Sequence, residues 1–597
     1  MIIKNLQGNK FSFSNYSKNL TFIKTSIKYL LYLFIALAIF FAGALTYSQL
    51  NGSVIKTSVF ATIKSIKNLP RTINSKITDT SEIIYIDVNF KNLQKLEKLR
   101  AKYVSSNFMA QDENSYVKAK IRNKDITLNA KIRFKGDTAA PHLLGNDKWS
   151  FRAKINGDDT LFGAKKFSIQ KPESLQYIYE WLFNKAFAAE NGIAKRYSFV
   201  RVYFNGEYWG VMSFHDHFDK FLIENNKRRA GPIIRFDKNY AVIGGDQGGD
   251  FASRLGKTTA LPITHYERNK SNEDDEFLEN YNIAANLLEG LRQGHFSVSE
   301  VLDLDKFAIY AALVDLFDGY HSFIDNNMVF YFNPATSLLE PIAEDVAPGV
   351  HTSKLSIGIA DGFLSSNGFL WDDWTHTFGN RIILQSLFRD INFIEKYTYY
   401  LSKFSEKDYV ESFFKSIEKE LKSELNTLYA DLDYGSYSFD TENNVLFNNQ
   451  QKIKNELKPP LAILSYFKKK EDKKVYLDVG SVQYFPIEVI SISYQNNIFP
   501  IKKNKIIKGK NRYELVNYKE IEVELPNEIT SIDKFNNSLF INYKILGTNK
   551  IYSEKVYQSS IVSKNFQSDF VRKEPNYQDF KFIKYNKASN EIIIKPG

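Results

Sequence analysis

The pattern of hydrophobic and polar positions predicts a sheet-rich region followed by a helical one. Between residues 126 and 155, apolar and polar side chains alternate along two segments, as they do in half-buried β-strands. Further along, Asn205 and Gly206, a dipeptide preferred in tight hairpin turns, separate two more predicted strands. These strands cover residues 199–204 and 210–214, and helices are predicted where apolar residues recur every three or four positions, at 175–190, 307–317 and 410–428.

One segment near the N-terminus is far more apolar than the rest. Residues 29–47 carry no charge and are numerous enough to cross a bilayer as a helix, and the preceding segment contains Lys18, Lys24 and Lys28 without an acid. This pattern predicts a signal-anchor helix; the alternative is a cleaved signal peptide that ends at Ala42-Gly-Ala44. Basic residues flank the segment equally on both sides. Because a single N-terminal anchor usually leaves a large domain outside, we expect a single-pass membrane protein with an extracytoplasmic domain.

Changes in composition divide the chain into domains. Pro459-Pro460 and the charged run 468–474 interrupt the helical pattern, and residues 475–597 follow as short strands at the spacing of a β-sandwich. We therefore expect an α+β fold. Its parts are a basic segment at 1–28, a transmembrane helix at 29–47, a linker at 48–80, an α+β domain at 81–458, a second linker at 459–474 and a β-sandwich at 475–597; the α+β domain is sheet-rich to about residue 273 and helical after it.

Charge and cysteine content exclude several classes of function. The chain has no cysteine, which removes disulfides, thiol catalysis and cysteine-ligated zinc. Its net charge of +11 comes from lysines scattered along the 597 residues, so we do not expect nucleic acid as a partner. Attraction to anionic lipids or phosphorylated ligands remains open.

The densest group of candidate catalytic residues lies between residues 302 and 350. A predicted helix ends in a polar loop at 318–327, an apolar strand follows, and after a turn at Asn333-Pro334 a second short strand leads to Glu344-Asp345. Two strands joined by a tight turn hold their ends close together. The loop and the two carboxylates can therefore face one volume, as a base, an amide and a metal-binding carboxylate do in kinases. On spacing alone, the alternative is two solvated loops that flank a hairpin.

Two series of short motifs resemble the spore-coat protein H (CotH) kinase family. The second half of that family's pattern is similar to His321, Asn327, Phe-Asn-Pro, Glu-Pro-Ile and Asp345, in this order. The first half resembles upstream blocks, and the whole resemblance covers roughly residues 131 to 350. These blocks are Arg133-Phe-Lys-Gly-Asp137, Lys148-Trp-Ser-Phe-Arg152, Phe167-Ser-Ile-Gln170, Phe204-Asn-Gly-Glu-Tyr-Trp-Gly210 and His215-Asp-His-Phe-Asp219. The resemblance implies an atypical, two-lobed kinase-like domain.

The resemblance also implies ligands for ATP and Mg²⁺. Asp345 stands at the family's metal-binding position, and Asn327 matches an asparagine that supports the metal or orients the loop. Lys148, Arg152 and Lys154, on the polar side of a strand, are expected to meet the phosphates of the nucleotide. From the strand pattern alone these three side chains form a solvated face, and that alternative stays open.

The general base is where the sequence departs from the family pattern. Kinases of this family place an aspartate a few residues before the asparagine, whereas here the candidates are Asp325, two residues before it, and Asp318, nine before it. His321 lies between them and is the third candidate. The family's usual Trp-Asp before the strand end is replaced by Ala343-Glu344-Asp345. A catalytically inactive member is therefore an alternative.

Two functions follow from the sequence. The first is an ATP- and Mg²⁺-dependent atypical kinase that phosphorylates a protein hydroxyl or an envelope component. The second is a non-catalytic, pseudokinase-like envelope scaffold that binds a polymer or a partner protein. In both, the chain is expected to contact the membrane through its N-terminal helix.

Overall fold

The computed structural model describes most of the chain from residue 53 onward. The predicted transmembrane helix at 29–47 and the candidate base Asp325 lie outside the described residues. No helix within the described ranges is both long and apolar enough to cross a membrane. These ranges are 53–106, 109, 113–124, 126–144, 148–237, 261–267, 274–323, 327–346, 382–458, 461–494, 497–510, 515–524, 539–558, 581–586 and 591–596.

The chain divides into two compact units, of which the first combines residues 1–80 with residues 425–438. Its main described element is helix α2 (Ser53–Thr78), so the predicted linker at 48–80 is wrong for most of its length. Pro70 lies inside this helix instead of ending it. The helix is fixed to the rest of the unit by Arg71, whose guanidinium donates to the carbonyl of Tyr437 at 3.0 Å and lies 3.6 Å from the ring centroid of Tyr429.

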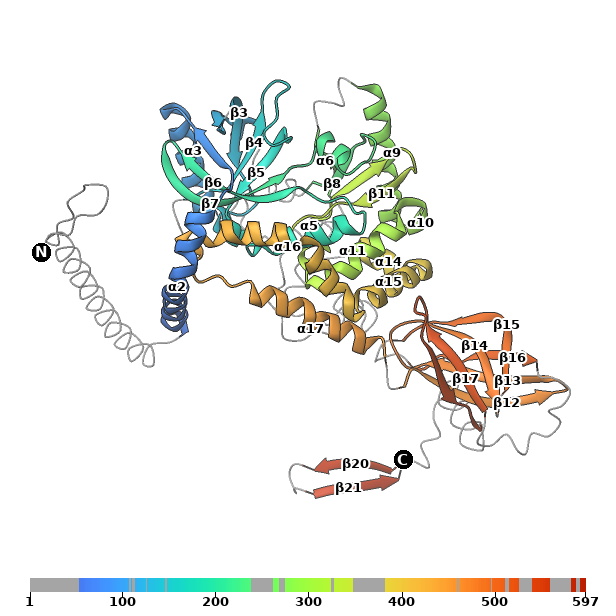
Figure 1. Cartoon of the computed structure of the whole chain (residues 1–597). Coiled ribbons are helices and arrows are strands. Elements are labelled where there is room, and N and C mark those ends of the chain that lie inside the picture. Colours follow the sequence, from blue (N-terminus) through green and yellow to red (C-terminus); the bar gives the residue numbers. More distant parts are fainter. Residues whose placement is uncertain are drawn as a thin grey trace, which may run out of the picture. The chain divides into compact units, whose positions relative to one another are not determined.

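The second unit, residues 81–424 with 439–597, begins with a closed seven-stranded barrel in the order β1-β2-β3-β4-β5-β7-β6. All neighbouring strands pair antiparallel except β1 and β6, which are parallel. Figure 1 shows helix α3 (Phe90–Ser106) beside the barrel. The strands are β1 (Ile83–Asp87), β2 (Val117–Arg122), β3 (Thr127–Phe134), β4 (Phe151–Ile155), β5 (Lys166–Gln170), β6 (Tyr197–Phe204) and β7 (Glu207–Asp216).

Alternation along the strands places the core inside the barrel. In β2 and β3 every second residue is buried, and buried apolar residues from all seven strands contribute to one hydrophobic cluster that includes Ile132 and Phe151. The predicted hairpin is confirmed between β6 and β7, where Asn205 and Gly206 have φ of 49° and 87°. Both values are left-handed, as a turn of this type requires.

Helix α11 (Leu304–Phe317) is the most buried helix segment of the helical region, since every residue from Phe307 to Phe317 is buried. In the sequence it is followed by two short strands. Among the helices, it contacts α15 and α17 most extensively. The other helices are α4 (Ala140–Leu143), α5 (Tyr179–Ala189), α6 (Lys220–Asn225), α9 (Asp275–Gln293), α10 (Val298–Val301), α14 (Ile382–Arg389), α15 (Ile391–Phe404), α16 (Lys407–Tyr429) and α17 (Asp440–Glu456).

A second small sheet lies beside these helices, in the order β11-β10-β8-β9. The predicted pair of strands around Asn333 is confirmed: β10 and β11 are antiparallel, and Phe330 pairs with Pro341. The strands of this sheet are β8 (Ile233–Phe236), β9 (Ile263–His265), β10 (Phe330–Asn333) and β11 (Leu338–Pro341).

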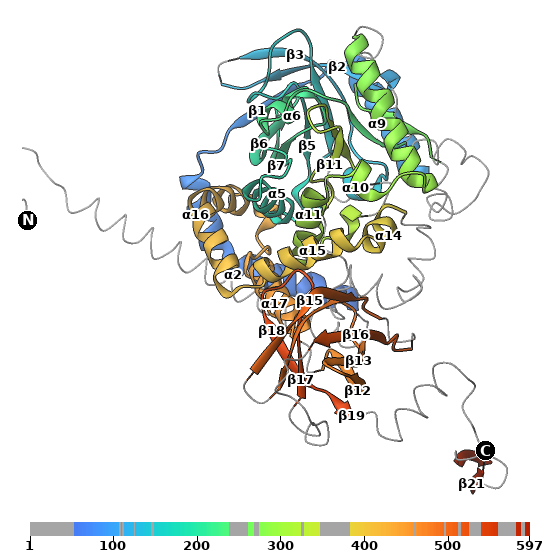
Figure 2. The ribbon, with the colours of Figure 1, turned by 90° about the vertical axis from the view of Figure 1, so that its right-hand side faces the viewer.

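The C-terminal part contains two four-stranded sheets, β16-β13-β12-β19 and β15-β14-β17-β18, which share one hydrophobic core (Figure 2). This is a sandwich arrangement, and beyond it β20 and β21 form a hairpin. The strands are β12 (Ile463–Glu471), β13 (Lys474–Ser481), β14 (Ile487–Tyr494), β15 (Asn497–Ile507), β16 (Lys519–Glu524), β17 (Leu539–Ile545), β18 (Ile551–Lys555), β19 (Tyr557–Gln558), β20 (Lys581–Asn586) and β21 (Glu591–Pro596).

The predicted linker at 459–474 is also wrong, because β12 occupies most of it. The charged run belongs to the hairpin between β12 and β13, whose tip includes Asp472 with a φ of 47°. Lysines near a hairpin tip remain solvated while alternate residues such as Ile463 and Ser465 are buried. A run of charges therefore marked a hairpin and not a break between domains.

Candidate functional site

The loop before β10 and the residues after β11 meet, as the hairpin between them predicted. The Nδ1 atom of His321 lies 3.1 Å from Oδ2 of Asp345, and the amide of Asn327 donates to the carbonyl of His321 at 2.9 Å. Asp345 has a φ of 55°, which a non-glycine residue adopts only where its surroundings hold it. The structure thus brings together three of the predicted site residues.

A buried ion-pair cluster adjoins Asp345. Lys195 donates to Glu180 at 3.0 Å and also to Glu344, and the side chains of Lys195 and Glu180 are each only 1% exposed. Glu180 lies in the first turn of α5, Lys195 precedes β6, and Glu344 follows β11, so three separate segments converge here. We call Glu180, Lys195 and Glu344 the carboxylate–lysine triad.

The triad fixes the backbone that carries Asp345. The two carboxylate oxygens of Glu180 accept the backbone N–H groups of Asp345 at 3.2 Å and of Val346 at 2.8 Å. On the lysine side, Oδ1 of Asn184 accepts the N–H of Lys195 at 2.7 Å. Lys195 and Asp345 are therefore held from one helix, α5, and this explains how a residue in a left-handed conformation keeps its place.

Electrostatics stabilise the charged form of the triad. Burial by itself would lower the pKa of Lys195, but Glu344 and Glu180 outweigh it and raise the pKa above its ordinary value. For Glu344, burial acts to raise the pKa, whereas Lys195 and Lys135 lower it and prevail. Lys195 and Glu344 are therefore both charged at neutral pH.

Basic side chains of the barrel lie toward this cluster. Lys135 follows β3 and is buried, and its pKa is lowered to about 8, first by burial and then by Arg152 and Lys195, although Glu344 and Asp345 oppose the shift. Arg152 is opposite Arg133 in the register of β3 and β4. Burial and the charge of Arg133 lower the pKa of Arg152.

These arginines have polar atoms without a partner. The Nε–H groups of Arg133 and Arg152 are both buried and donate to no hydrogen-bond acceptor among the described residues. Buried donors in folded proteins are normally satisfied. A polyanion that entered between the barrel and Glu344 would supply the acceptors, and the residues present therefore fit the phosphates of a nucleotide.

Of the three cofactor-binding residues predicted from the sequence, Arg152 is the one whose surroundings include the triad, through Glu344. Lys154 lies between Lys131 and Lys166 in the sheet register, two residue pairs away from Arg152. Lys148 is buried just before β4. The alternative of a solvated strand face therefore does not hold for Lys148, which is buried, nor for the Nε atom of Arg152.

The candidate bases are not all in one place. His321 contacts Asp345, but Asp318 caps the C-terminus of α11, is buried, and has an Oδ2 atom without a hydrogen-bond partner among the described residues. Burial raises the pKa of Asp318 to about 7, opposed by Lys452 of α17. Asp318 is therefore a buried carboxyl at the end of α11 that experiences the charge of Lys452, and its role as base stays a prediction, as does that of Asp325.

The donor set fits a divalent cation that also binds phosphate. No group of three or more histidines and carboxylates able to hold a metal occurs in the part of the chain that the structure describes. Mg²⁺, however, is usually held by one or two protein carboxylates with phosphates and water. Asp345 supplies such a carboxylate. Asn327 supplies an amide, and the side chains of both residues contact Nδ1 of His321.

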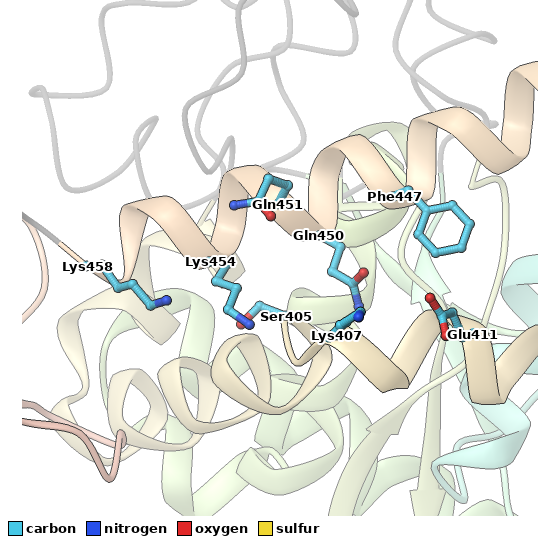
Figure 3. Close-up of a pocket in the computed structure, with 8 residues that line it drawn as sticks. All are labelled: Ser405, Lys407, Glu411, Phe447, Gln450, Gln451, Lys454 and Lys458. Atoms are coloured by element: carbon cyan, nitrogen blue, oxygen red, sulfur yellow. The ribbon is translucent and has the colours of Figure 1, made fainter.

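A separate cavity lies outside this cluster. The cavity has a volume of about 460 Å³. Figure 3 shows the residues that line it, which come from the start of α16 and from α17 and the residues just after it. Lys407, Lys454 and Lys458 line it with one acid, Glu411, which makes it positively charged. None of the residues of the carboxylate–lysine triad borders it, so it is not the candidate catalytic site.

Sequence reasoning missed Glu180, Lys195 and Lys135. The only signal for Glu180 was an acid within the apolar run Tyr179–Phe183, which on a buried helix requires a charged partner. Lys195 lies between a helix and a strand, where no repeat of apolar residues indicates which side chains are buried. Lys135 was part of a motif block, but nothing in its spacing distinguished it from neighbouring basic residues.

Comparison with known proteins places this geometry in a family. A model described as CotH kinase protein matches residues 132–460, which is more than half of the chain. The match runs from the end of β3 through β11 and includes the triad and the loop that carries His321 and Asn327. A search of curated proteins finds no match. The chain belongs to the CotH kinase family.

Proposed function

We propose that this protein is an atypical kinase that transfers the γ-phosphoryl group of ATP, with Mg²⁺, to a hydroxyl group of a protein or of an envelope component. Membership of the CotH kinase family supports the reaction class. The observation that carries the proposal is that Asp345 is held by the triad, while Arg152, whose buried Nε–H has no partner among the described residues, experiences the charge of Glu344 of the same triad. The barrel and the helices would be the two lobes of the kinase domain.

Each side of the site has a distinct task. ATP and Mg²⁺, when bound, supply the phosphoryl group and neutralise its charge. Arg133, Arg152 and Lys135 offer donors and positive charge to phosphate oxygens. Asp345 and Asn327 are the candidate metal ligands, and Lys195 keeps Glu344 ionised beside them.

The acceptor hydroxyl must lose its proton as its oxygen attacks phosphorus. His321 lies closest to Asp345 among the described candidates and is 48% exposed, so it is accessible to an acceptor. Asp325, in the same loop, and Asp318 remain the other candidates. In each case the base takes the proton, and the leaving group is the β-phosphate oxygen of the nucleotide.

We further propose a single-pass membrane protein with the large domain outside the cytoplasm. The uncharged segment at 29–47 and the lysines before it support an anchor. A protein substrate or an envelope polymer would then be the acceptor, and nucleic acid would not be a partner.

The second candidate function is a non-catalytic scaffold. It is favoured by the position of Asp318, which is buried at the C-terminus of α11, and by Ala343-Glu344-Asp345 in place of the Trp-Asp that the resemblance leads one to expect. In this case the site would hold a nucleotide without transferring its phosphoryl group, or hold none.

The two candidates are separated by one experiment on the full chain in detergent. Wild type and Asp345→Asn are incubated with γ-labelled ATP and Mg²⁺, and both nucleotide binding and label transfer are measured. Asp472→Asn is the matched control, because Asp472 also has a positive φ but lies at an exposed hairpin tip. Transfer that is lost in Asp345→Asn and kept in Asp472→Asn supports the kinase. Binding without transfer supports the scaffold, and a folded protein without ATP affinity refutes the nucleotide site.

A further inference from the structure

Helix α2 has its polar and apolar sides reversed relative to a helix of a soluble protein. Thr72 and Ser75 are 2% and 3% exposed, whereas Ile73 and Ile77 are 53% and 78% exposed. A helix that packs on a domain normally buries its apolar stripe and exposes its polar one. The exposed side of α2 therefore requires another explanation.

The apolar side chains form one continuous stripe. At 3.6 residues per turn, they fall within an arc of about 120° along the helix. Ile63 and Leu69 are 39% and 42% exposed, and Ile66 is half-buried. The residues of the stripe, which we call the α2 stripe, are Ile63, Ile66, Leu69, Pro70, Ile73 and Ile77.

The opposite side of α2 is occupied by protein. Asn68 and Arg71 donate to the carbonyl of Gly435 at 2.9 and 3.3 Å, and Asp79, just after the helix, accepts from the hydroxyl of Thr427 at 3.0 Å. These contacts all lie within the first compact unit. They fix the rotation of the helix about its axis, so the α2 stripe cannot turn inward.

The charge of α2 suits an anionic surface. The helix has no Asp or Glu, and Lys64, Lys67 and Lys76 are exposed on it. Lys67 and Lys76 lie on the two edges of the α2 stripe by helical spacing. Apolar residues flanked on both sides by lysines are typical of helices that lie in the plane of a membrane, with the lysines at the headgroups.

Two further features favour a lipid surface over a protein partner. The uncharged segment 29–47 ends only six residues before Ser53, which keeps α2 close to any bilayer that this segment enters. Pro70 has no N–H, so one carbonyl in the preceding turn lacks its helical partner. At the membrane–water interface, unlike in the hydrocarbon core of the bilayer, water can donate a hydrogen bond to this carbonyl.

We propose that α2 is an interfacial helix, which lies on an anionic lipid surface through the α2 stripe and so sets the distance and rotation of the first compact unit relative to the membrane. The site is separate from the kinase reaction, and the proposal does not depend on catalysis.

The absence of cysteine allows a direct test on the full chain. Single cysteines at Ile73→Cys and at Ala61→Cys are labelled with an environment-sensitive fluorophore. Ala61 is exposed and lies on the other side of the helix from the α2 stripe. Each protein is incorporated into nanodiscs that contain phosphatidylglycerol and a lipid with a nitroxide near its headgroup.

The expected result is quenching at position 73 that is at least threefold stronger than at position 61, with a blue-shifted emission. Discs of phosphatidylcholine alone should weaken it, because they lack negative charge. Equal quenching at both positions, or a failure of the chain to associate with anionic discs, overturns the proposal. A blue shift at 73 without quenching also overturns it, since the stripe would then be covered by protein.

A second variant distinguishes contact from general proximity. Ile77→Asp places a charge on the α2 stripe and should reduce quenching at position 73 at least twofold. Ile498→Asp is the matched control, because Ile498 is 69% exposed on β15 in the C-terminal sandwich. Unchanged quenching in Ile77→Asp, with helix content retained by circular dichroism, refutes the interfacial position.

Discussion

Removal of the positive charge from the carboxylate–lysine triad should destabilise the kinase domain strongly. In Lys195→Met, Glu180 and Glu344 lose their common partner while Glu180 stays almost completely buried. Loss of one partner from a buried ion pair costs about 3–5 kcal/mol, because the remaining charge is left in a medium of low polarity. That is a large part of the roughly 5–15 kcal/mol by which domains are stable.

The same helix offers a matched control. Lys185 of α5 pairs with Glu420, but the two side chains are 33% and 60% exposed. Because solvent screens such a pair, Lys185→Met should cost about 1 kcal/mol or less. The two substitutions remove the same charge and leave the same side chain, so their difference reports burial.

Urea unfolding followed by tryptophan fluorescence measures this difference. All five tryptophans lie between residues 149 and 374, so the signal follows the kinase domain and not the sandwich. Restoring neutrality with Glu180→Gln and Glu344→Gln in the Lys195→Met background should recover part of the stability. Equal losses in Lys195→Met and Lys185→Met would refute the argument that the triad is desolvated.

Three further predictions concern the same domain. Arg152→Met should weaken ATP binding about 10-fold or more, since charge-assisted hydrogen bonds contribute about 1.5–3 kcal/mol, whereas Arg122→Met, on the exposed pair with Asp87, should leave the affinity unchanged by calorimetry. ATP affinity should fall as pH rises through about 8, where Lys135 loses its proton, and Lys135→Arg should remove that fall in a binding titration. The pKa of Asp318 is raised from 3.8 to about 7, which means that the folded state holds the proton more tightly than the unfolded state. The free energy of unfolding should therefore decrease as pH rises from 3.8 to about 7. In urea unfolding, Asp318→Asn should be more stable than wild type at pH 8, by up to about 4 kcal/mol, and should show no gain at pH 4.

The sequence predicted the elements that repeat a simple period. The alternation from residue 127 to residue 134 gave β3, and the hairpin at Asn205-Gly206 followed from the conformational needs of its turn. The predicted linkers failed for a related reason. A proline or a run of charges often marks the end of an element, but not always. Here Pro70 lies inside helix α2, and the lysines near Asp472 belong to the hairpin of β12 and β13.

The candidate site was predicted where local order determines it and missed where it depends on distant segments. His321 and Asp345 meet because β10 and β11 form an antiparallel pair close to both. Lys195 reaches Glu344 through a pairing of Ile193 with Ile342, which are separated by more than a hundred residues. No spacing along the chain encodes such a contact, because it follows from how the barrel strands and the helices pack.

The triad favours a catalytic site over a scaffold. Buried ion pairs contribute little net stability, and apolar residues of similar volume often serve a core as well or better. Glu180, Lys195 and Glu344 are therefore poorly explained as a device for stability. Their bonds instead fix the backbone at Asp345 and keep Glu344 ionised opposite Lys135. A scaffold does not need a candidate metal ligand such as Asp345 to be held in one position, whereas phosphoryl transfer depends on positioning. Glu180→Gln should accordingly reduce label transfer far more than it weakens ATP binding, and an equal loss of both would remove this argument.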